Sequence, residues 1–186
     1  MSNKNRDFGA RVERTYRTKF IDLGFSFCKT TRQASRLLDD CKVDLMNLPI
    51  NVQVKGGKSY DTMNASEILS EMSEALVQNY PPDHQYHKQL GVIIHHRRAK
   101  GRRKDYDTLV YMTLNDFKHL AKPSEVVIHD DTRKKFNKIR RLKKIVESHT
   151  VRKPYIIRFN QSEQTMIMTS WRVFVYFFKR KYLTTK

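Results

Sequence analysis

The sequence predicts an α/β protein with a mixed β-sheet flanked by helices, and two observations support this prediction. Apolar residues recur at helical spacing in some segments and form short runs typical of strands in others. These segments follow one another as helix, three strands, helix and strand, an order that fits helices packed on one mixed sheet. Because the character of the chain changes at Pro123, we expect a core over residues 1–122. A basic helical and hairpin extension over 123–186 would pack on that core or form a dimer interface.

The first expected helix runs from about Arg6 to Leu23, because its apolar residues recur three or four positions apart. Gly24 ends it, as a glycine commonly does at a helix C-terminus. Glu13 falls at the edge of the apolar stripe, where its carboxylate can reach a site at the border of the core. The stripe consists of Phe8, Val12, Tyr16, Phe20 and Leu23.

Strands are expected over residues 25–30, 41–46, 50–55, 90–95 and 108–112, where apolar residues alternate or run together. The polar segment 32–40 is interpreted as a loop or short turn. Asn64 begins a helix that ends at Pro81-Pro82, and residues 114–121 form a shorter helix.

Beyond Pro123 we expect a helix over 132–149, capped by Asp130 or Asp131 and rich in Lys and Arg. A hairpin over 153–169 follows. Ser170 caps a last helix whose aromatic stripe packs on its own core or lies in a dimer interface. That stripe includes Trp171, Phe174, Phe178 and Tyr182.

The charge of the chain is its strongest global property. The 186 residues carry 37 Lys and Arg against 19 Asp and Glu, a net charge of +18. Such an excess of positive charge favours a polyanionic partner, and nucleic acid is the usual one. The less specific alternative is a basic surface without a nucleic-acid partner.

The cysteines and the hydropathy pattern indicate the cellular compartment. Cys28 and Cys41 lie in apolar stretches and form neither a disulfide framework nor a zinc motif, so we expect buried free thiols in a reducing compartment. The N-terminus has no signal-peptide pattern, and no apolar run is long enough to span a bilayer. We expect an intracellular, cytoplasmic protein, nucleoid-associated or, if viral, in the host-cell cytoplasm.

The segment 44–55 contains the residues that suggest chemistry. If residues 48–49 form the two-residue loop of a hairpin, Asp44 lies directly opposite Gln53. Lys55 points to the same face as Gln53, two residues further along the strand. The proline in the loop can shift the register by one residue, but Gln53 and Lys55 share a face in either register.

This set of oxygen atoms suits a hard divalent cation. Mg²⁺ (or Mn²⁺) takes one or two carboxylates and can use amide or main-chain carbonyl oxygens. Asp44 would supply the charge, Gln53 an amide oxygen and Val54 its main-chain carbonyl. Lys55 would orient or deprotonate a water molecule for phosphodiester hydrolysis. An isolated Asp with a Gln-x-Lys is more often a surface hairpin without function.

Glu13, Gly24-Phe25, Asp44 and the strand Gln53-Val54-Lys55 together resemble the PD-(D/E)XK nuclease superfamily, and most closely the archaeal-type Holliday junction resolvases and related phage nucleases. The resemblance covers about residues 9–121 and implies a restriction-endonuclease-like core. It also implies a magnesium-dependent DNA endonuclease, acting on branched DNA and forming a homodimer. By this likeness Glu13, Asp44, Gln53 and Lys55 are catalytic, and Glu13, Asp44, Gln53 and Val54 bind the metal.

The chain departs from the family pattern at Gln53, where the family has an acidic residue. A neutral ligand lowers the charge of the metal site. An alternative is therefore a catalytically weak or inactive nucleic-acid-binding protein on the same scaffold. A third possibility is a basic RNA- or ribosome-associated protein without metal dependence.

Two basic segments are expected to contact the phosphate backbone. The first is a loop that contains Arg97, Arg98, Lys100, Arg102, Arg103 and Lys104. The second is the helix after Pro123, with Lys134, Lys138 and Arg141 among its exposed residues. Solvated surfaces without a partner are the alternative for both. The histidines near the fourth strand are interpreted as structural or phosphate-contacting, because they lack the spacing of a zinc site.

Overall fold

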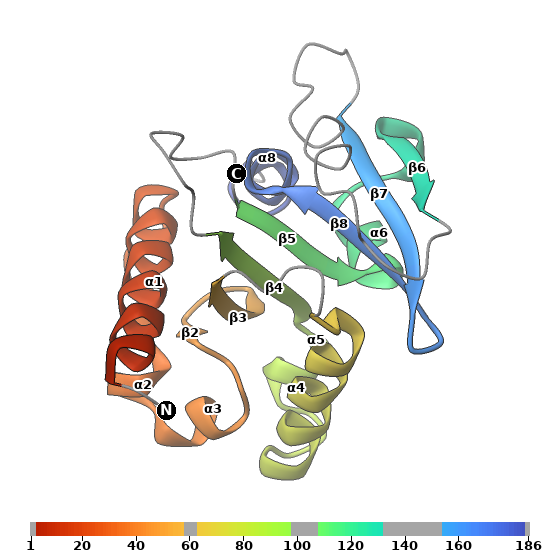
Figure 1. The fold of residues 1–186 in the computed structure, drawn as a ribbon. Coiled ribbons are helices and arrows are strands. Elements are labelled where there is room, and N and C mark those ends of the chain that lie inside the picture. Colours follow the sequence, from red (N-terminus) through yellow and green to blue (C-terminus); the bar gives the residue numbers. More distant parts are fainter. Residues whose placement is uncertain (1–2, 58–62, 98–107, 132–153, 185–186) are drawn as a thin grey trace.

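The computed structural model describes residues 3–57, 63–97, 108–131 and 154–184 (Figure 1). Within these residues the strands form one eight-stranded mixed sheet flanked by helices, so the α/β class and the mixed sheet predicted from the sequence are confirmed. In spatial order the strands are β1 (Lys29–Thr30), β2 (Leu45–Met46), β3 (Ile50–Gly57), β4 (Leu90–Arg97), β5 (Thr108–Thr113), β8 (Gln164–Ser170), β7 (Tyr155–Gln161) and β6 (Val127–Asp131).

Both parallel and antiparallel pairs occur in this sheet. β3 is parallel to β4, and β6 is parallel to β7, whereas the other neighbours are antiparallel. The parallel pair β3–β4 needs a crossover connection, which contains α4. β5 pairs with β8, so strands from both sides of Pro123 belong to one sheet.

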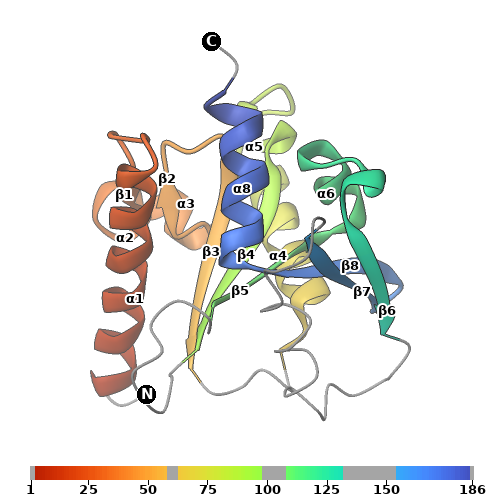
Figure 2. The same cartoon turned by 90° about the horizontal axis from the view of Figure 1, so that it is seen from above.

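The described helices cover both faces of the sheet. They are α1 (Asn3–Asp22), α2 (Thr31–Ala34), α3 (Arg36–Asp40), α4 (Ala65–Asn79), α5 (Gln85–Lys88), α6 (Leu114–Leu120), the short 3₁₀ helix η1 (Pro123–Glu125) and α8 (Trp171–Tyr182). α1, α6 and α8 pack into one core cluster, and α3 and α4 pack into a second. Figure 2 shows α8 in front of the central strands and α4 behind them.

The alternation of side chains along the central strands explains why there are two core clusters. Val52 and Val54 of β3 belong to the cluster with α1, whereas Ile93 and Tyr111 belong to the cluster with α4. Successive side chains of a strand point to opposite faces, so β4, β5, β7 and β8 contribute to both clusters, whereas the apolar residues of β3 belong to the first cluster.

The terminal helix α8 packs on the first cluster. Phe174 and Phe178 stack with ring centroids 5.3 Å apart, and Phe178 lies edge-on to Phe20 of α1 at 5.6 Å. The Ser170 hydroxyl accepts a hydrogen bond from the Val173 amide, which confirms the predicted N-cap.

Several segments differ from their sequence-based predictions. β1 and β2 are two residues long, because Phe25–Cys28 turns and Lys42 adopts a positive φ of 64° that ends the extended backbone. The segment 32–40 forms α2 and α3 and is not a loop. Asp130 and Asp131, the two candidate caps, lie in β6, and Asp130 bonds Arg158 of β7 at 2.8 Å. The helix expected over 132–149 lies outside the described residues.

Cys28 and Cys41 are buried free thiols, as expected. No described helix is both long and apolar enough to cross a membrane.

Candidate functional site

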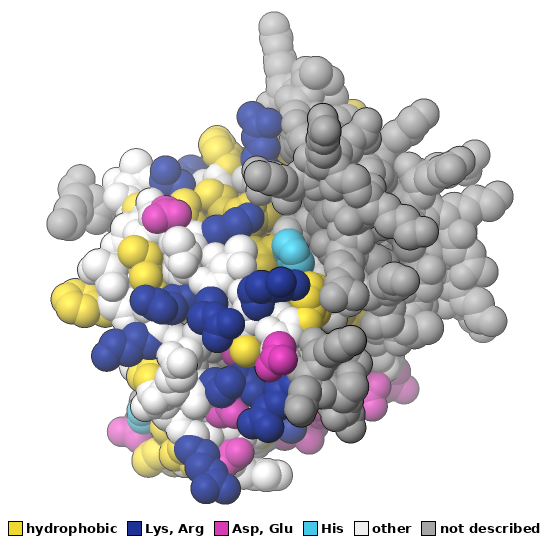
Figure 3. Space-filling view, turned by 60° about the vertical axis from the view of Figure 1, so that its left-hand side comes forward, with side chains coloured by type: hydrophobic (Ala, Val, Ile, Leu, Met, Phe, Trp, Pro, Cys, Tyr) yellow, Lys and Arg dark blue, Asp and Glu magenta, His cyan; other side chains and the backbone are white. Residues whose placement is uncertain are grey.

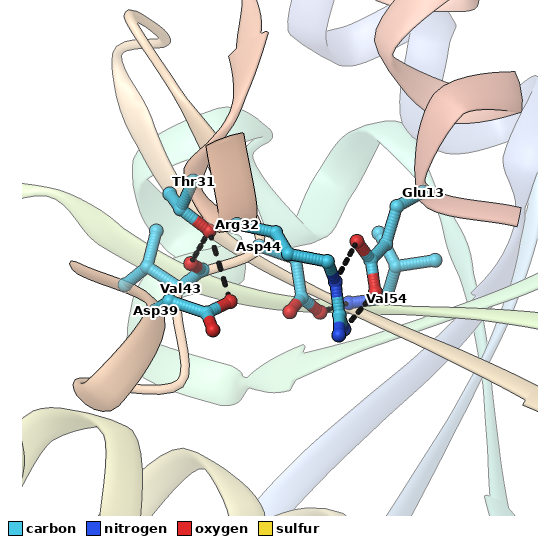
Figure 4. A network of polar contacts seen from close by, with 7 residues as sticks. All are labelled: Glu13, Thr31, Arg32, Asp39, Val43, Asp44 and Val54. Carbon is cyan, nitrogen blue, oxygen red and sulfur yellow. Dashed lines mark hydrogen bonds and ion pairs between the residues drawn. The ribbon is translucent and has the colours of Figure 1, made fainter. Parts of the chain in front are cut away.

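Asp44 directly precedes β2 in the β2–β3 hairpin, and its side chain faces β3. Leu45 pairs with Val52, in the register expected from the sequence. One residue earlier the ladder changes, because the Asp44 amide donates to the Val52 carbonyl at 2.8 Å. The Asp44 carboxylate accepts a hydrogen bond of 2.6 Å from the Val54 amide (Figure 4). The carboxylate thus takes the position of a strand acceptor, and the prediction that it lies on the sheet face directly opposite Gln53 is wrong.

The same geometry orients the Val54 carbonyl. In a strand, the N–H and the C=O of one residue point to the same side. Because the Val54 amide faces the edge where Asp44 lies, its carbonyl oxygen faces that edge as well. Two oxygen donors that the sequence predicted for a metal, from Asp44 and Val54, therefore share one edge of β3.

Glu13 approaches this edge from α1. Its residue is 5% exposed, and its carboxylate is bound by Arg32 through two hydrogen bonds, Nη2 to Oε1 at 2.8 Å and Nε to Oε2 at 3.2 Å. Figure 4 shows the Arg32 guanidinium between the Glu13 and Asp44 carboxylates. Such a bidentate contact is the strongest form of a guanidinium–carboxylate pair.

Arg32 is positioned by the preceding residue. The Thr31 amide donates to the Asp44 carbonyl at 3.0 Å, and the Thr31 hydroxyl donates to the Val43 carbonyl at 2.6 Å. These bonds attach the start of α2 to the chain that leads into Asp44. The pKa of Arg32 is raised, first by its hydrogen bonds to Glu13 and also by the charges of Asp39 and Asp44. Arg32 is therefore the cation that is hydrogen-bonded to this carboxylate cluster.

Burial dominates the electrostatics of Asp44. It raises the pKa of the Asp44 carboxyl from 3.8 to about 7. The Val54 amide and the Lys55 charge act in the opposite direction, and the negative charges of Glu13 and Asp39 raise the pKa further. Near neutral pH this carboxyl is poised between its two protonation states, and a cation would favour the ionised form.

Gln53 and Lys55 lie on the other face of β3 from Val52 and Val54. Gln53 is 5% exposed, and its Oε1 is buried without a hydrogen-bond partner among the described residues. Lys55 is partly buried, and its charge acts on Asp44. A buried acceptor without a partner costs about 1–3 kcal/mol, so Gln53 Oε1 indicates a place for a ligand or ion.

The structure thus brings Glu13, Asp44 and Val54 together, whereas Gln53 and Lys55 point from the opposite face of β3, with the Lys55 charge acting on Asp44. The sequence analysis did not identify Arg32 or Asp39. The polar segment 32–40 has no pattern that distinguishes Arg32 from Arg36. The Arg36 side chain is exposed, and its Nε lies 4.0 Å from the Asp40 carboxylate.

The oxygen donors of the candidate site differ from a cluster of metal-binding side chains. Among the described residues, no group of three or more His, Cys, Asp or Glu side chains could hold one. The candidate set has instead two carboxylates, one amide oxygen and one main-chain carbonyl. All are oxygen donors, which suits Mg²⁺ or Mn²⁺ and does not suit a structural zinc ion.

The predicted nucleic-acid-binding residues lie largely outside the described residues. This holds for Arg98, Lys100, Arg102, Arg103 and Lys104, and for Lys134, Lys138 and Arg141. Arg97 ends β4.

A basic surface that the sequence analysis did not single out lies on α1. Figure 3 shows the side of the molecule that carries α1, where Lys and Arg side chains outnumber acidic ones. We define this α1 basic surface as Arg6, Arg11, Arg14, Arg17 and Lys19, all exposed or partly exposed. Glu13 lies on the same helix, so the α1 basic surface borders the candidate site.

Two of the histidines in or near the fourth strand, His84 and His96, have structural contacts. His84 accepts a hydrogen bond from the Tyr86 amide at the start of α5, and its ring packs on Tyr80. His96 lies 3.1 Å from the Tyr16 hydroxyl. These contacts agree with the structural interpretation of the two histidines.

Comparison with known proteins gives no relative. No protein-family model matches the chain, and neither a curated protein nor a solved structure is significantly similar to it.

Proposed function

We propose that this protein is a metal-dependent DNA endonuclease of the PD-(D/E)XK type, selective for branched DNA such as a four-way junction. The observation that carries the proposal is the convergence of Glu13, Asp44 and Val54 at one edge of β3. Gln53 of the same strand adds a buried oxygen that has no hydrogen-bond partner among the described residues. The alternative of a surface hairpin is weakened because Glu13 and Gln53 are buried and Asp44 is half-buried. Burial of carboxylates is costly without a cation or a functional reason.

The arrangement of elements supports a restriction-endonuclease-like core. α1 precedes the antiparallel strands β1, β2 and β3, and α4 leads to β4, which is parallel to β3. This is the order helix, three strands, helix, strand from which the resemblance was drawn.

The residues of the site have distinct roles in this proposal. Glu13, Asp44, Gln53 and Val54 would hold Mg²⁺ or Mn²⁺ with four oxygen atoms. When bound, the cation supplies stabilisation of negative charge on the phosphate and a more acidic water molecule. Lys55 orients the attacking water or accepts its proton. The hydrogen bond from the Val54 amide fixes the direction of the Asp44 carboxylate.

Arg32 compensates the charge of the carboxylates when no divalent cation is bound. Its side chain is 40% exposed, so the guanidinium can leave Glu13 without crossing the core. We assign the Arg32 guanidinium a second position on the scissile phosphate. A guanidinium group binds two phosphate oxygens in the same bidentate geometry in which it binds a carboxylate.

DNA would lie along the α1 basic surface and contact the basic segments 97–104 and 132–144. A homodimer would supply two active sites for the two strands of a junction. Light scattering on the free protein and on its junction complex tests this assembly.

The experiment that tests the proposal is a cleavage assay on duplex, single-stranded and four-way-junction DNA, with Mg²⁺, Mn²⁺ or EDTA. Cleavage that requires a divalent cation and is fastest on the junction supports it. Binding without product under every condition contradicts it and supports the second candidate function.

That second candidate is a nucleic-acid-binding protein without catalytic activity. Two observations favour it, namely the bidentate pair of Arg32 with Glu13 and the neutral Gln53 in an acidic position. Both reduce the negative charge available to a metal ion. If the protein only binds DNA, Asp44→Asn would leave both its affinity for DNA and the absence of cleavage unchanged.

A further inference from the structure

A cavity on the α4 side of the sheet has a chemistry opposite to that of the molecule as a whole. Its volume is about 480 Å³, and it lies between α4, the α5 segment, the start of β4 and the first turn of α6. This volume is within the range of about 300–1,000 Å³ for small-molecule sites and far above that of one water molecule. It can therefore hold a ligand of several non-hydrogen atoms.

Two residues that line this cavity have a buried acceptor without a hydrogen-bond partner among the described residues. These acceptors are Asn51 Oδ1 and Gln89 Oε1. Asn51 is only 3% exposed, and its Nδ2 already donates to the Tyr86 carbonyl at 2.8 Å. That bond fixes the amide orientation and leaves the oxygen as an acceptor. These two residues line the cavity, and their side-chain oxygen atoms, which have almost no accessible surface, need a donor.

Carboxylates add negative charge to the same cavity. Asp116 lies beside Gly91, where a Cβ atom would come 3.8 Å from Asp116 Oδ2. Burial raises the pKa of Asp116, whereas hydrogen bonds from the Thr113 side chain and the Gly91 main chain and the charge of His119 act in the opposite direction. Glu74 lies on the exposed side of α4 and also lines the cavity.

No Lys or Arg occurs among the described residues that line the cavity, although the chain has 37 of them. A phosphate group would meet carboxylates there and no basic side chain other than His87, so the DNA backbone is a poor ligand. The apolar part of the lining includes Leu69, Met72 and Leu76 of α4, which suits an aliphatic chain.

We propose that this cavity binds an alkyl guanidinium or alkyl ammonium group, with the cationic head at Asn51, Gln89 and Asp116 and the aliphatic stem on α4. The group belongs either to a small free amine or to an Arg or Lys side chain of a protein partner. The proposal does not depend on the nuclease function, because none of these residues belongs to the metal site.

Isothermal titration calorimetry of the whole protein tests this, with agmatine and spermidine as free amines and a short peptide with a single arginine as the protein arm. Butylurea is the neutral control, because it has N–H donors and an alkyl chain without charge. Saturable binding of agmatine that is about tenfold tighter than that of butylurea supports a cation site. Tighter binding of the peptide assigns the group to a protein partner, and tighter binding of agmatine assigns it to a free amine.

Matched variants locate the binding site. Asp116→Asn is expected to weaken agmatine about tenfold, and Glu74→Gln about threefold, because each removes one negative charge from the cavity. Glu71→Gln is the control, since Glu71 is an exposed carboxylate of α4 that does not line the cavity. Glu74 is exposed, so its variant is expected to fold even if Asp116→Asn does not.

Three outcomes would overturn the proposal. The first is the absence of saturable agmatine binding, which leaves the buried oxygens to water. The second is equal weakening by Glu74→Gln and Glu71→Gln, which means a diffuse surface effect. The third is tighter binding of a nucleoside such as adenosine than of agmatine, which assigns the cavity to a base.

Discussion

The carboxylate of Asp44 accepts a 2.6 Å hydrogen bond from the main-chain amide of Val54, and this contact fixes the candidate site to the edge of β3. Asp44 is 10 residues away from Val54 in sequence and belongs to the preceding arm of the hairpin. The bond holds an ionisable group, half-buried and with a pKa of about 7, at the place where the β2–β3 ladder ends.

The raised pKa of Asp44 predicts a pH-dependent effect of Asp44→Asn on stability. The folded wild type binds a proton at Asp44 up to about pH 7, whereas the unfolded chain releases it near pH 3.8. The wild type therefore loses stability as the pH rises from about 4 to about 7, by an amount of roughly 4 kcal/mol at most. Asn has no charge to bury, so the variant should be the more stable protein at pH 8, with an advantage that shrinks toward pH 4.

Urea unfolding at several pH values without divalent cations measures this effect. Asp40→Asn is the control, because Asp40 is an exposed carboxylate of α3. The free energy of unfolding of this variant should equal that of the wild type at each pH. An advantage of Asp44→Asn that does not change with pH would contradict the burial of this carboxyl.

Substitution of Arg32 tests its role as the compensating cation. Arg32→Gln leaves the buried Glu13 without its partner, so we expect a loss of about 1–2 kcal/mol, less than for a fully buried pair because Arg32 is partly exposed. Mg²⁺ or Mn²⁺ should recover this loss. The rise in melting temperature on addition of the cation should therefore be larger in Arg32→Gln than in the wild type.

Arg36→Gln is the matched control for that experiment, because Arg36 is 94% exposed and 4.0 Å from its nearest carboxylate. Its metal-induced rise in melting temperature should equal that of the wild type. The same rise in all three proteins would show that Arg32 does not share its position with a metal ion.

Restoring a carboxylate at position 53 should strengthen metal binding. Gln53→Glu adds a negative charge beside Asp44 and Glu13, and we expect an affinity for Mn²⁺ about tenfold higher, together with faster cleavage. Calorimetric titration with Mn²⁺ measures the affinity. Gln78→Glu, an exposed position of α4, controls for net charge. Unchanged Mn²⁺ affinity in Gln53→Glu would remove Gln53 from the proposed ligands.

The packing of α8 predicts where the core is most sensitive. Phe178 is fully buried between Phe20 and Phe174, so Phe178→Ala should cost about 3–5 kcal/mol in the free energy of unfolding. Tyr176 on the same helix is 58% exposed, and Tyr176→Ala should cost less than about 1 kcal/mol. Urea denaturation gives both values, and similar losses for the two variants would contradict the described orientation of α8.

The sequence was sufficient for the elements whose patterns are local and long. The periodicity of α1, the Asn64 and Ser170 caps, β3 and the β7–β8 hairpin all agree with the structure. β6 was not predicted, because its five residues pair only with β7, more than twenty residues later. Two expected strands shrank to β1 and β2, because the backbone turns before each of them.

The candidate site was predicted in its parts and not in its arrangement. Spacing and face parity identified Asp44, Gln53 and Lys55, and the edge of a helical stripe identified Glu13. The contact of Arg32 with Glu13 depends on how α2 attaches to the chain at Asp44. The rotation of the Asp44 carboxylate toward Val54 follows from the end of a ladder. Both are consequences of tertiary structure that pattern alone does not contain.

The most direct test of the central claim is the rate of cleavage of a four-way DNA junction by the wild type and by Asp44→Asn, in Mg²⁺ and in EDTA. The account predicts cleavage by the wild type in Mg²⁺ only, and a loss of about 100-fold or more in Asp44→Asn with junction binding retained. Equal cleavage by the two proteins, or cleavage that persists in EDTA, would contradict it.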